Sequence, residues 1–253
     1  QNLPKNVIEI WGYVVTEMIN NAIDHSSGKA IWIYVKQNNV QTSIIIDDDG
    51  EGIFRKIKRE CNLSDECQAV LELSKGKLTT DPSKHSGEGI FFSSRMVDYF
   101  CVMSGNVQFS HDAGYVNDWV QEMAGDAMQG TAVIMRLANN SERVIKEVFD
   151  MYTTNEDDSY GFTKTVIPVR LAQYGDDLLI SRSQAKRVLS RVDKFQSVYF
   201  DFEGVDSIGQ AFADEIFRVF QLEHPDIEIH YVKANKEVTH MIKRALSHLE
   251  GKS

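Results

Sequence analysis

A long amphipathic pattern at the start of the chain, over residues 7–25, constrains the fold more than any other feature. Its apolar side chains recur at the i, i+3, i+4 spacing of a buried helix face, at Val7, Ile8, Trp11, Val14, Val15, Met18, Ile19, Ala22 and Ile23. Polar residues and a glycine at 26–28 end the pattern. Two β-rich runs follow, at 30–36 and 42–47. The sequence therefore predicts a helix that leads into a β-hairpin.

The rest of the first 140 residues predicts more strands behind a long polar segment. Residues 53–86 mix short apolar groups with Lys, Thr, Pro and Ser, which is typical of a helix followed by a long loop. Residues 89–99 have a helical pattern. Strand-like segments then occur at 100–104, 107–110, 116–121 and 132–137. We expect the first domain to span residues 1–138.

The second half of the chain alternates strands and helices. Residues 139–161 are polar and acidic, with a helix expected at 142–151, so we interpret them as a connecting segment. Strands are predicted at 165–171, 197–202 and 227–232, and helices at 184–194, 208–222 and 237–248. Such alternation predicts a small α/β domain over residues 162–253.

Composition excludes several classes of protein. A chain of 253 residues suits two modest domains. The net charge of −10 argues against a nucleic-acid footprint, so that partner is not expected. The sequence lacks an apolar run of roughly 18 residues and a signal pattern, which predicts a cytoplasmic protein with no membrane contact. Three cysteines, Cys61, Cys67 and Cys101, are wrongly spaced for a zinc cluster and are expected to be structural thiols.

The first helix carries three oxygen-bearing side chains on one face. Glu17, Asn21 and Asp24 are spaced four and three apart, which places them together beside the apolar stripe. An Asn oxygen suits Mg²⁺, and a carboxylate one turn earlier suits deprotonation of a water that attacks a phosphoryl group. Taken alone, the same residues are also consistent with an ordinary polar helix face.

Two glycine-containing turns follow. The run IIIDDDGEGI delivers Asp48 from a strand into a turn with Gly50 and Gly52, where a carboxylate can accept from an exocyclic amine and glycines allow close approach of a flat base. In HSGEGIFFSSRMV, Gly87 and Gly89 precede a helical run, so free N–H groups and the helix dipole would face an anion. Lys75, Lys77 and Lys84 lie before this turn and are candidates to supply positive charge.

In chain order, TEMINNAIDHS, DDDGEGI, SGEGI and GTAV resemble the N, G1, G2 and G3 boxes of the GHKL ATP-binding superfamily. This resemblance implies an α+β fold of the Bergerat type, an α/β sandwich with helices on one face of a mixed sheet. It implies ATP and Mg²⁺ as ligands, with Asn21 as the metal ligand. The implied nucleotide-binding set is Asn21, Asp48, Gly50, Gly52, Lys77, Gly87, Glu88, Gly89 and Thr131.

The same resemblance assigns roles to these positions. Asp48 would read adenine, helped by Thr131 directly or through a water, while the G2 glycines would meet the phosphates. Glu17 matches the general base of the hydrolysing branches, and the segment 53–86 would be a mobile ATP lid. His25 lies inside the N box, which favours a structural or site-lining role over a phosphoacceptor role. The residues leave hydrolysis and phosphotransfer both open.

In the second domain, FQSVYFDFEGVDSIGQAFADEIFRVF resembles the central strand, turn and helix of STAS-like domains, which include anti-anti-sigma proteins phosphorylated on serine. The family's D-S-S-G reads D-S-I-G here, so Ser207 is the one serine of the motif. Ser207 and Gln210 also form an S-x-x-Q pattern, which predicts a helix cap without phosphorylation. Both interpretations remain open from the sequence.

Three functions are consistent with these features. The first is a Mg·ATP-binding regulatory switch with slow ATPase activity that controls contact with a protein partner. The second is a serine kinase of the anti-sigma partner-switching type, acting on Ser207 or on a separate STAS protein. The third is an interaction module without catalysis. A homodimer is open in each case.

Overall fold

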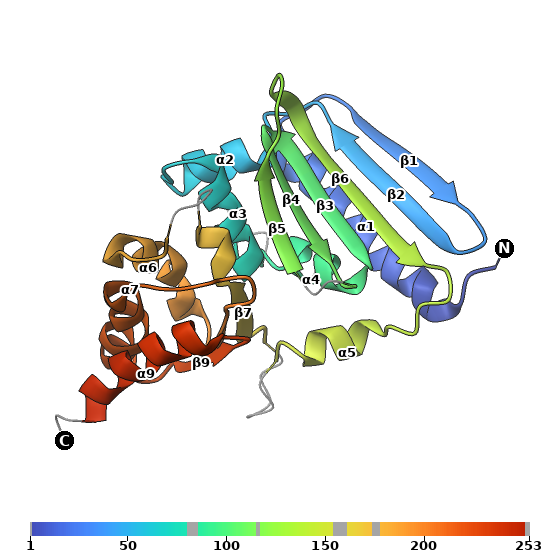
Figure 1. The fold of residues 1–253 in the computed structure, drawn as a ribbon. Helices are drawn as coiled ribbons and strands as arrows, with labels where there is room; N and C mark the ends of the chain where they lie inside the picture. Colours follow the sequence, from blue (N-terminus) through green and yellow to red (C-terminus); the bar gives the residue numbers. More distant parts are fainter. Residues whose placement is uncertain (1, 80–85, 115–116, 154–160, 174–177, 251–253) are drawn as a thin grey trace. The chain divides into compact units, whose positions relative to one another are not determined.

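The computed structural model describes residues 2–79, 86–114, 117–153, 161–173 and 178–250 (Figure 1). The chain divides into two compact units, Gln1–Met151 and Tyr152–Ser253, and each is described by itself. The domain boundaries expected from the sequence, at residues 138 and 162, stay predictions.

The first unit is built on a six-stranded sheet in the order β1-β2-β6-β3-β4-β5. Its strands are β1 (Ile31–Gln37), β2 (Gln41–Asp48), β3 (Tyr99–Gly105), β4 (Val107–Asp112), β5 (Asn117–Glu122) and β6 (Met128–Ala138). Every neighbouring pair is antiparallel, so the expected mixed pairing is corrected. β2 and β3 do run in the same direction, as a strand–helix–strand connection favours, but β6 lies between them and pairs antiparallel with both.

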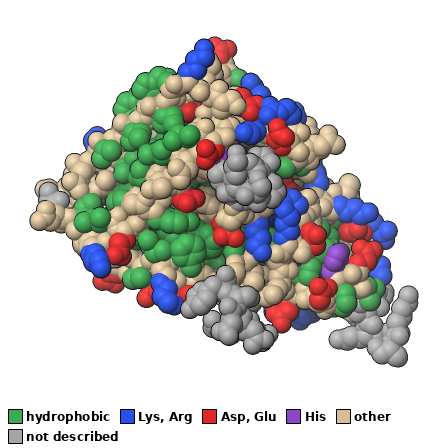
Figure 2. Space-filling model, turned by 180° about the vertical axis from the view of Figure 1, so that it is seen from behind, with side chains coloured by type: hydrophobic (Ala, Val, Ile, Leu, Met, Phe, Trp, Pro, Cys, Tyr) green, Lys and Arg blue, Asp and Glu red, His purple; other side chains and the backbone are tan. Residues whose placement is uncertain are grey.

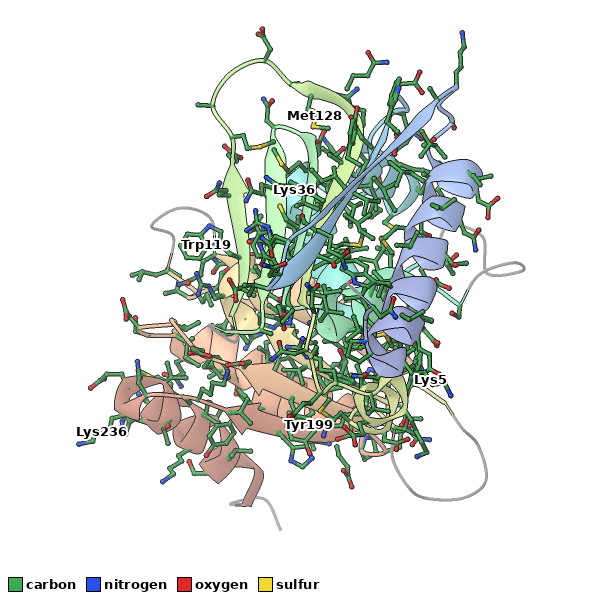
Figure 3. All side chains as sticks on the ribbon, turned by 90° about the vertical axis from the view of Figure 1, so that its right-hand side faces the viewer. Lys5, Lys36, Trp119, Met128, Tyr199 and Lys236 are labelled. Carbon is green, nitrogen blue, oxygen red and sulfur yellow. The ribbon has the colours of Figure 1, made fainter. Side chains whose placement is uncertain are left out.

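Helices cover one face of this sheet, as the Bergerat-type expectation requires. They are α1 (Lys5–His25), α2 (Ile53–Glu60), α3 (Glu66–Lys75) and α4 (Gly89–Met96), and α5 (Ile145–Asp150) packs on α1 and α4. α1 runs along the sheet (Figure 3), and its buried residues are Val7, Ile10, Trp11, Val14, Met18 and Ala22. β2 buries alternate residues, Ile44 and Ile46 among them, as expected for a strand with one covered face. The α+β fold class predicted from the sequence is confirmed.

The segment expected to form one helix and a long loop, residues 53–86, contains two helices. α2 buries Phe54 and Ile57, three residues apart. α3 begins after Asp65, whose side chain accepts a hydrogen bond from the Gln68 N–H at 2.8 Å. The sequence analysis missed this cap because the polar residues around it looked like loop. The loop before α4 therefore starts only after Lys75.

α5 falls within the segment interpreted as a connection, and it packs onto the first unit. The Phe149 ring lies 5.7 Å from the Tyr13 ring and 4.4 Å from the Phe92 ring, centroid to centroid. Val148 is buried as well. These aromatic contacts attach α5 to both α1 and α4.

Some apolar side chains of the first unit stay exposed. Figure 2 shows hydrophobic side chains at the surface on the side where β1 lies. Among the large apolar side chains that are exposed are Trp32, Ile33, Tyr34 and Val35, all in β1.

The second unit has a three-stranded parallel sheet in the order β7-β8-β9, which confirms the predicted small α/β domain. Its elements are β7 (Lys164–Pro168), η1 (Val169–Ala172), α6 (Arg182–Leu189), η2 (Val192–Lys194), β8 (Ser197–Asp201), α7 (Gln210–Asp214), η3 (Glu215–Phe220), α8 (Gln221–Glu223), β9 (Glu228–Val232) and α9 (Lys236–Glu250). α7, η3 and α8 follow one another without a break, and η3 is a π-helical segment. The buried core of the second unit includes Ile167, Val198, Phe200, Phe212 and Ile242.

The helix cap predicted at Ser207 is wrong. α7 begins at Gln210 with Gly209 as its N-cap, and no side chain caps it. A Cβ on residue 209 would lie 2.7 Å from the Ile180 Cα, so the glycine is needed for close packing of two backbone segments. Packing therefore explains Gly209, while Ser207 lies outside the helix, partly exposed.

Candidate functional site

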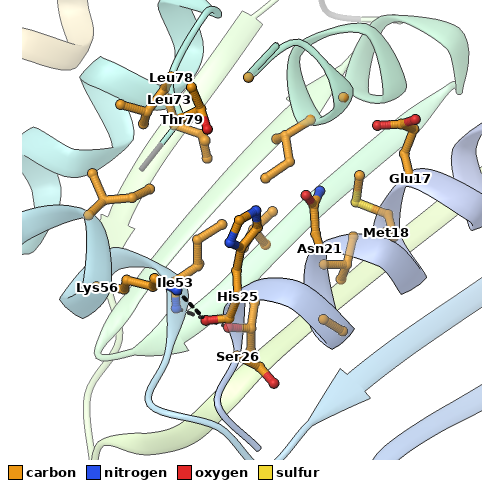
Figure 4. A pocket seen from close by; sticks show the side chains of 18 of the residues that line it. Glu17, Met18, Asn21, His25, Ser26, Ile53, Lys56, Leu73, Leu78 and Thr79 are labelled. Carbon is orange, nitrogen blue, oxygen red and sulfur yellow. Dashed lines mark hydrogen bonds between the residues drawn. The ribbon is translucent and has the colours of Figure 1, made fainter. Parts of the chain in front are cut away.

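A cavity of about 280 Å³ lies between α1, the sheet and the segment that precedes α4 (Figure 4). The predicted site residues that line it are Glu17, Asn21, Asp48, Gly87, Gly89 and Thr131. Of the other predicted residues, Gly50, Gly52, Lys77 and Glu88 do not line it. The structure thus brings together residues from four separate motifs in one cavity.

The α1 wall of the cavity is formed by Glu17, Asn21 and His25, each one turn beyond the last. At 100° per residue these three side chains span about 80° of the helix surface. Asp24 lies just outside this arc, is exposed and does not line the cavity, so its expected place on the wall is corrected. His25 takes that place, and its position four residues after Asn21 is the signal that could have identified it.

Asn21 carries an orphaned polar group inside the protein. Its amide nitrogen is buried and has no hydrogen-bond partner among the described residues. A carboxamide that rotates by 180° exchanges its nitrogen and oxygen, so this position offers either a donor or an acceptor to a ligand. Burying such a group without a partner costs about 1–3 kcal/mol, which a bound ligand would recover. The environment of Asn21 fits a metal or phosphate ligand.

Asp48 lies on the sheet side of the cavity and is only 6% exposed. Burial is the main reason that its pKa lies above the usual value, and the neighbouring Asp47 and Asp49 raise it further. The Gly50 N–H donates to Asp48 Oδ1 at 2.9 Å. This hydrogen bond and one from the Thr131 backbone lower the pKa of Asp48 and so oppose the effect of burial. A carboxylate has further acceptor positions, so Asp48 keeps the capacity to accept from a donor in the cavity.

Thr131 pairs with Asp48 across β2 and β6. Its hydroxyl oxygen accepts a hydrogen bond from the Ile53 N–H at 3.0 Å, at the start of α2. Because that bond uses only an acceptor position, the hydroxyl hydrogen stays available to Asp48 or to a ligand.

The glycines of DDDGEGI have packing partners of their own. A Cβ on residue 50 would lie 2.1 Å from the Ser26 carbonyl oxygen, and one on residue 52 would lie 2.5 Å from Ser104 Oγ. Gly52 also has a φ of 90°, which other residues rarely adopt. These contacts explain both glycines, so their expected approach to a base stays a prediction.

The other end of the cavity combines a carboxylate with the start of a helix. A Cβ on Gly89 would lie 2.0 Å from Glu17 Oε2, so only glycine lets this carboxylate lie against the first residue of α4. The N-cap of α4, Glu88, makes no side-chain cap. The first N–H groups of α4 are therefore oriented as in helix starts that bind anions.

Charges beside this helix start interact with one another. Burial is the main reason that the pKa of Glu88 is raised; Lys77 and the Ser86 hydroxyl oppose the rise, and Glu17 adds to it. Gly87 has a φ of 73°, and its carbonyl accepts from the Leu78 N–H at 3.2 Å. This bond brings Leu78 and Gly87 together, next to Glu88 and Lys77.

The lysines predicted to supply positive charge separate into three cases. Lys77 lies near Glu88, and its expected contact with a nucleotide stays a prediction. Lys75 is instead the last residue of α3, 1% exposed, with its Nζ 2.8 Å from Glu72 Oε1. It is corrected from a loop cation to a buried ion-pair partner because α3 extends further than the sequence suggested. Lys84 lies outside the described residues.

Sequence reasoning did not identify the cation and most of the apolar lining of the cavity. Lys56 lines it from α2 and donates to the His25 carbonyl at 2.8 Å (Figure 4). Its apolar wall includes Met18, Ile46, Ile57, Phe91, Val102 and Val133. Met18 and Ile46 belong to runs interpreted only as core, so their pattern gave no sign that they face a ligand.

The fold and the cavity define a class: an α+β sandwich of the Bergerat type with a pocket between its helices and its sheet. The model of the family described as histidine kinase-, DNA gyrase B-, and HSP90-like ATPase matches residues 8–141. The chain belongs to this family of ATPases and kinases. The expected resemblance to GHKL proteins is thereby confirmed.

A second family model, described as a STAS-like domain of unknown function (DUF4325), matches residues 184–239, which confirms the STAS-like assignment of the second half. A solved structure, the 43K ATPase domain of gyrase B from Thermus thermophilus in complex with an aminocoumarin, is similar with 16% identity and a TM-score of 0.33. The match covers 49% of this chain and 33% of that chain, so this chain spans about a third of its length. No curated protein matches. Among the described residues, no helix is long and apolar enough to cross a membrane.

Proposed function

We propose that the protein is a Mg·ATP-binding regulator that hydrolyses ATP slowly and uses its nucleotide state to control contact with a protein partner. One observation carries this proposal: a single cavity holds a buried carboxylate, Asp48, an orphaned amide, Asn21, and a carboxylate at a helix start, Glu17. Asp48 suits the amine of a nucleobase, Asn21 suits a metal ion bound to phosphate, and Glu17 suits a reacting water.

At the sheet end, Asp48 and Thr131 would read the base. A buried carboxylate accepts from an exocyclic amine, and the Thr131 hydroxyl orients that carboxylate or a bridging water. The apolar wall near Ile46 and Val133 suits the flat faces of a purine. A base without an amine at this position would leave Asp48 buried without its donor, which disfavours binding.

At the helix end, the N–H groups that begin α4 would bind phosphate oxygens. Asn21 would hold Mg²⁺ through its amide oxygen, and the ion would supply neutralisation of phosphate charge. Glu17 lies beside Gly89, where it can orient a water and accept its proton as that water attacks the terminal phosphorus. Lys77 is positioned near Glu88 to balance its charge.

The decisive experiment measures thermal stability with and without Mg·ATP. The wild type should melt at a higher temperature with saturating nucleotide, because a ligand that binds only the folded state stabilises it by RT ln(1 + [L]/Kd). Asn21→Ala and Asp48→Ala should lose this shift. Asp24→Ala is the matched control, since Asp24 lies on the same helix outside the cavity. An unchanged melting temperature of the wild type would contradict the proposal.

A second candidate function, a serine kinase of the partner-switching type, is favoured by one observation. Ser207 is partly exposed and does not cap α7, so capping no longer explains its presence. Transfer would break the bond between the terminal phosphorus and the ADP oxygen and form one to the serine oxygen, with the hydroxyl proton passing to a base such as Glu17. Mass spectrometry after incubation with Mg·ATP tests it, with Ser207→Ala as the control. Absence of phosphate on Ser207 and on added STAS proteins would rule it out.

A further inference from the structure

β1 is an edge strand of the six-stranded sheet (Figure 1). Its large apolar side chains are exposed on both faces. Trp32 is 45% exposed, Ile33 47%, Tyr34 56% and Val35 66%. A sheet edge is a template for another strand unless charges, proline or a bulge protect it. β1 has no proline, pairs with β2 without a bulge, and has Lys36 as its one charge.

The outward backbone groups of β1 follow from its pairing with β2. The Asn38 N–H donates to the Gln41 carbonyl at 3.0 Å, and the Asp49 N–H donates to the Ala30 carbonyl at 3.4 Å. Ala30 and Asn38 therefore belong to hydrogen-bonded pairs with β2. Since such pairs occur at every second residue of an antiparallel ladder, the even-numbered residues of β1 direct their backbone groups to β2. The residues that direct N–H and C=O away from β2 are Ile31, Ile33, Val35 and Gln37.

We propose that a second copy of this chain occupies this edge: two β1 strands pair antiparallel about a two-fold axis at Tyr34, which joins two sheets into one. In this register Ile31 lies opposite the partner's Gln37, and Ile33 lies opposite the partner's Val35. All outward-directed backbone groups are then paired, and any shift of the register leaves some of them without a partner. This inference does not depend on the proposed nucleotide chemistry.

The side chains of β1 are complementary to themselves in this register. On one face, the Lys36 ammonium meets the indole ring of the partner's Trp32, which is a favourable cation–π arrangement. On the other face, Ile33 packs against the partner's Val35. Because Lys36 is the strand's one charge, no like charges lie directly opposite each other.

The opposite edge of the sheet does not offer the same surface. β5 has six residues, and two of them, Asp118 and Glu122, are acidic. Asp118 is buried in ion pairs, but Glu122 is exposed, and a charge at a sheet edge disfavours pairing with another strand. The apolar and nearly uncharged edge is therefore β1.

Light scattering during gel filtration, at increasing protein concentration, tests the interface. The wild-type mass should rise from 28.7 kDa towards twice that value. Val35→Pro removes an outward N–H without breaking the ladder to β2, and Tyr34→Lys places like charges at the axis, so both should stay monomeric. Trp119→Lys changes a side chain on β5 that is 48% exposed, and this variant should dimerise like the wild type. A wild type that is monomeric up to its solubility limit, or a dimer that persists in both β1 variants, overturns the proposal.

Cysteine cross-linking tests the register in a Cys61→Ser background, because Cys67 and Cys101 are buried. In Tyr34→Cys the two thiols would lie across a non-hydrogen-bonded pair with Cα atoms about 4.5 Å apart, within disulfide range. In Lys36→Cys the same thiols would be four residues out of line, roughly 13 Å apart. Mild oxidation should give a covalent dimer in the first variant and little in the second. Equal cross-linking of the two overturns the proposed pairing.

Discussion

Asp48 is held as a buried carboxyl group whose ionised form is costly. Burial raises its pKa above the usual 3.8, so protonation of Asp48 favours the folded state. The stability from this group is fully present below its unfolded pKa and is lost as pH rises through the raised pKa. At neutral pH, Asp48 thus lowers stability while it serves as an acceptor, a combination typical of functional sites.

We predict that Asp48→Asn abolishes nucleotide binding yet leaves the unliganded protein at least as stable as the wild type. The amide removes a buried charge but presents a donor where an acceptor is needed. Calorimetric titration with Mg·ATP and denaturant unfolding at pH 7 measure the two effects.

Wild-type affinity should also fall as pH drops through the raised pKa of Asp48, because the protonated carboxyl no longer accepts from the base. Asp126→Asn, an exposed change, serves as the control for both measurements. Tight binding by the Asp48→Asn variant would contradict this role.

Glu17→Gln should separate binding from hydrolysis. The amide keeps the size of the side chain but cannot accept a proton, so phosphate release should fall by about 10²–10⁴-fold while nucleotide affinity stays near the wild-type value. Single-turnover phosphate release and a binding titration measure these quantities. Asp24→Asn, on the same helix but outside the cavity, should leave both unchanged. Equal rates for Glu17→Gln and wild type would remove Glu17 from the reaction.

At this scale the sequence predicted residues whose chemistry is visible in a motif. Asp48 and Thr131 line the cavity together because β2 and β6 pair directly, and Asn21 lines it because α1 packs on that sheet. Lys75 and Lys56 could not be distinguished, since a lysine's sequence neighbours do not show whether its helix buries it against Glu72 or directs it to a cavity. That distinction depends on tertiary packing.

At the scale of elements, the start of α4 is tied to α1 through one glycine. We predict that Gly89→Ala lowers the rate of ATP hydrolysis with little loss of stability, because the new Cβ displaces the flexible end of Glu17 rather than backbone. Gly12→Ala is the matched change on α1, where a Cβ meets nothing within 4 Å. It should leave hydrolysis unchanged and raise stability by about 0.5–1 kcal/mol. Turnover and urea unfolding of both variants test the pair, and unimpaired hydrolysis by Gly89→Ala would contradict it.

A buried ionic network fixes the other end of α4. Arg95 Nη2 lies 3.2 Å from Asp118 Oδ2, and His111 Nδ1 lies 2.6 Å from Asp118 Oδ1. Arg95 also lies over the Phe91 ring, 4.3 Å from its centroid, and Phe91 lines the cavity. Burial raises the pKa of Asp118, but Arg95 and His111 outweigh this effect and hold it below its usual value.

Asp118→Asn should therefore destabilise the protein by about 3–5 kcal/mol at pH 7, since it leaves buried charge without its partner. A lowered folded pKa gives stability that is present above the unfolded value of 3.8 and is lost as pH falls through the folded value. The difference between variant and wild type should shrink in that acid range. Urea unfolding at pH 7 and in that acid range measures this difference in stability. A difference within about 0.5 kcal/mol at pH 7 would contradict the prediction.

Elements were predictable where one periodic pattern spans many residues, as in α1. α3 was missed because a short helix buried on several sides has no polar face to define its period. The pairing of β2 and β3 with β6 was not predictable either, since β6 inserts between strands that come far earlier in the chain. Local patterns specify that a strand exists, whereas tertiary packing specifies its neighbours.

At the scale of the whole molecule, the end of the first domain can be tested, because the first compact unit ends at Met151 and the sequence analysis placed this end at residue 138. We predict that the fragment 1–151 binds nucleotide and melts cooperatively, whereas the fragment 1–138 melts at a lower temperature. The shorter fragment lacks α5 and exposes the surfaces of Tyr13 and Phe92 that Phe149 covers. Thermal unfolding of both fragments measures this, and equal melting temperatures would favour the boundary at residue 138.

The position of β6 in the sheet has a consequence for the order in which the protein is made. β6 is the last strand of its unit to leave the ribosome, yet it pairs with β2 in a register that joins Gln41 to Ala138. The centre of the sheet therefore cannot form during synthesis until residues of β6 have emerged, and its closure spans a long loop of chain. In the second unit, β7 pairs with β8 from Lys164 and Ser197 onward, a much shorter span. Nascent chains of the first unit thus keep their strands unpaired for longer than those of the second unit, and unpaired strand edges favour aggregation while translation proceeds.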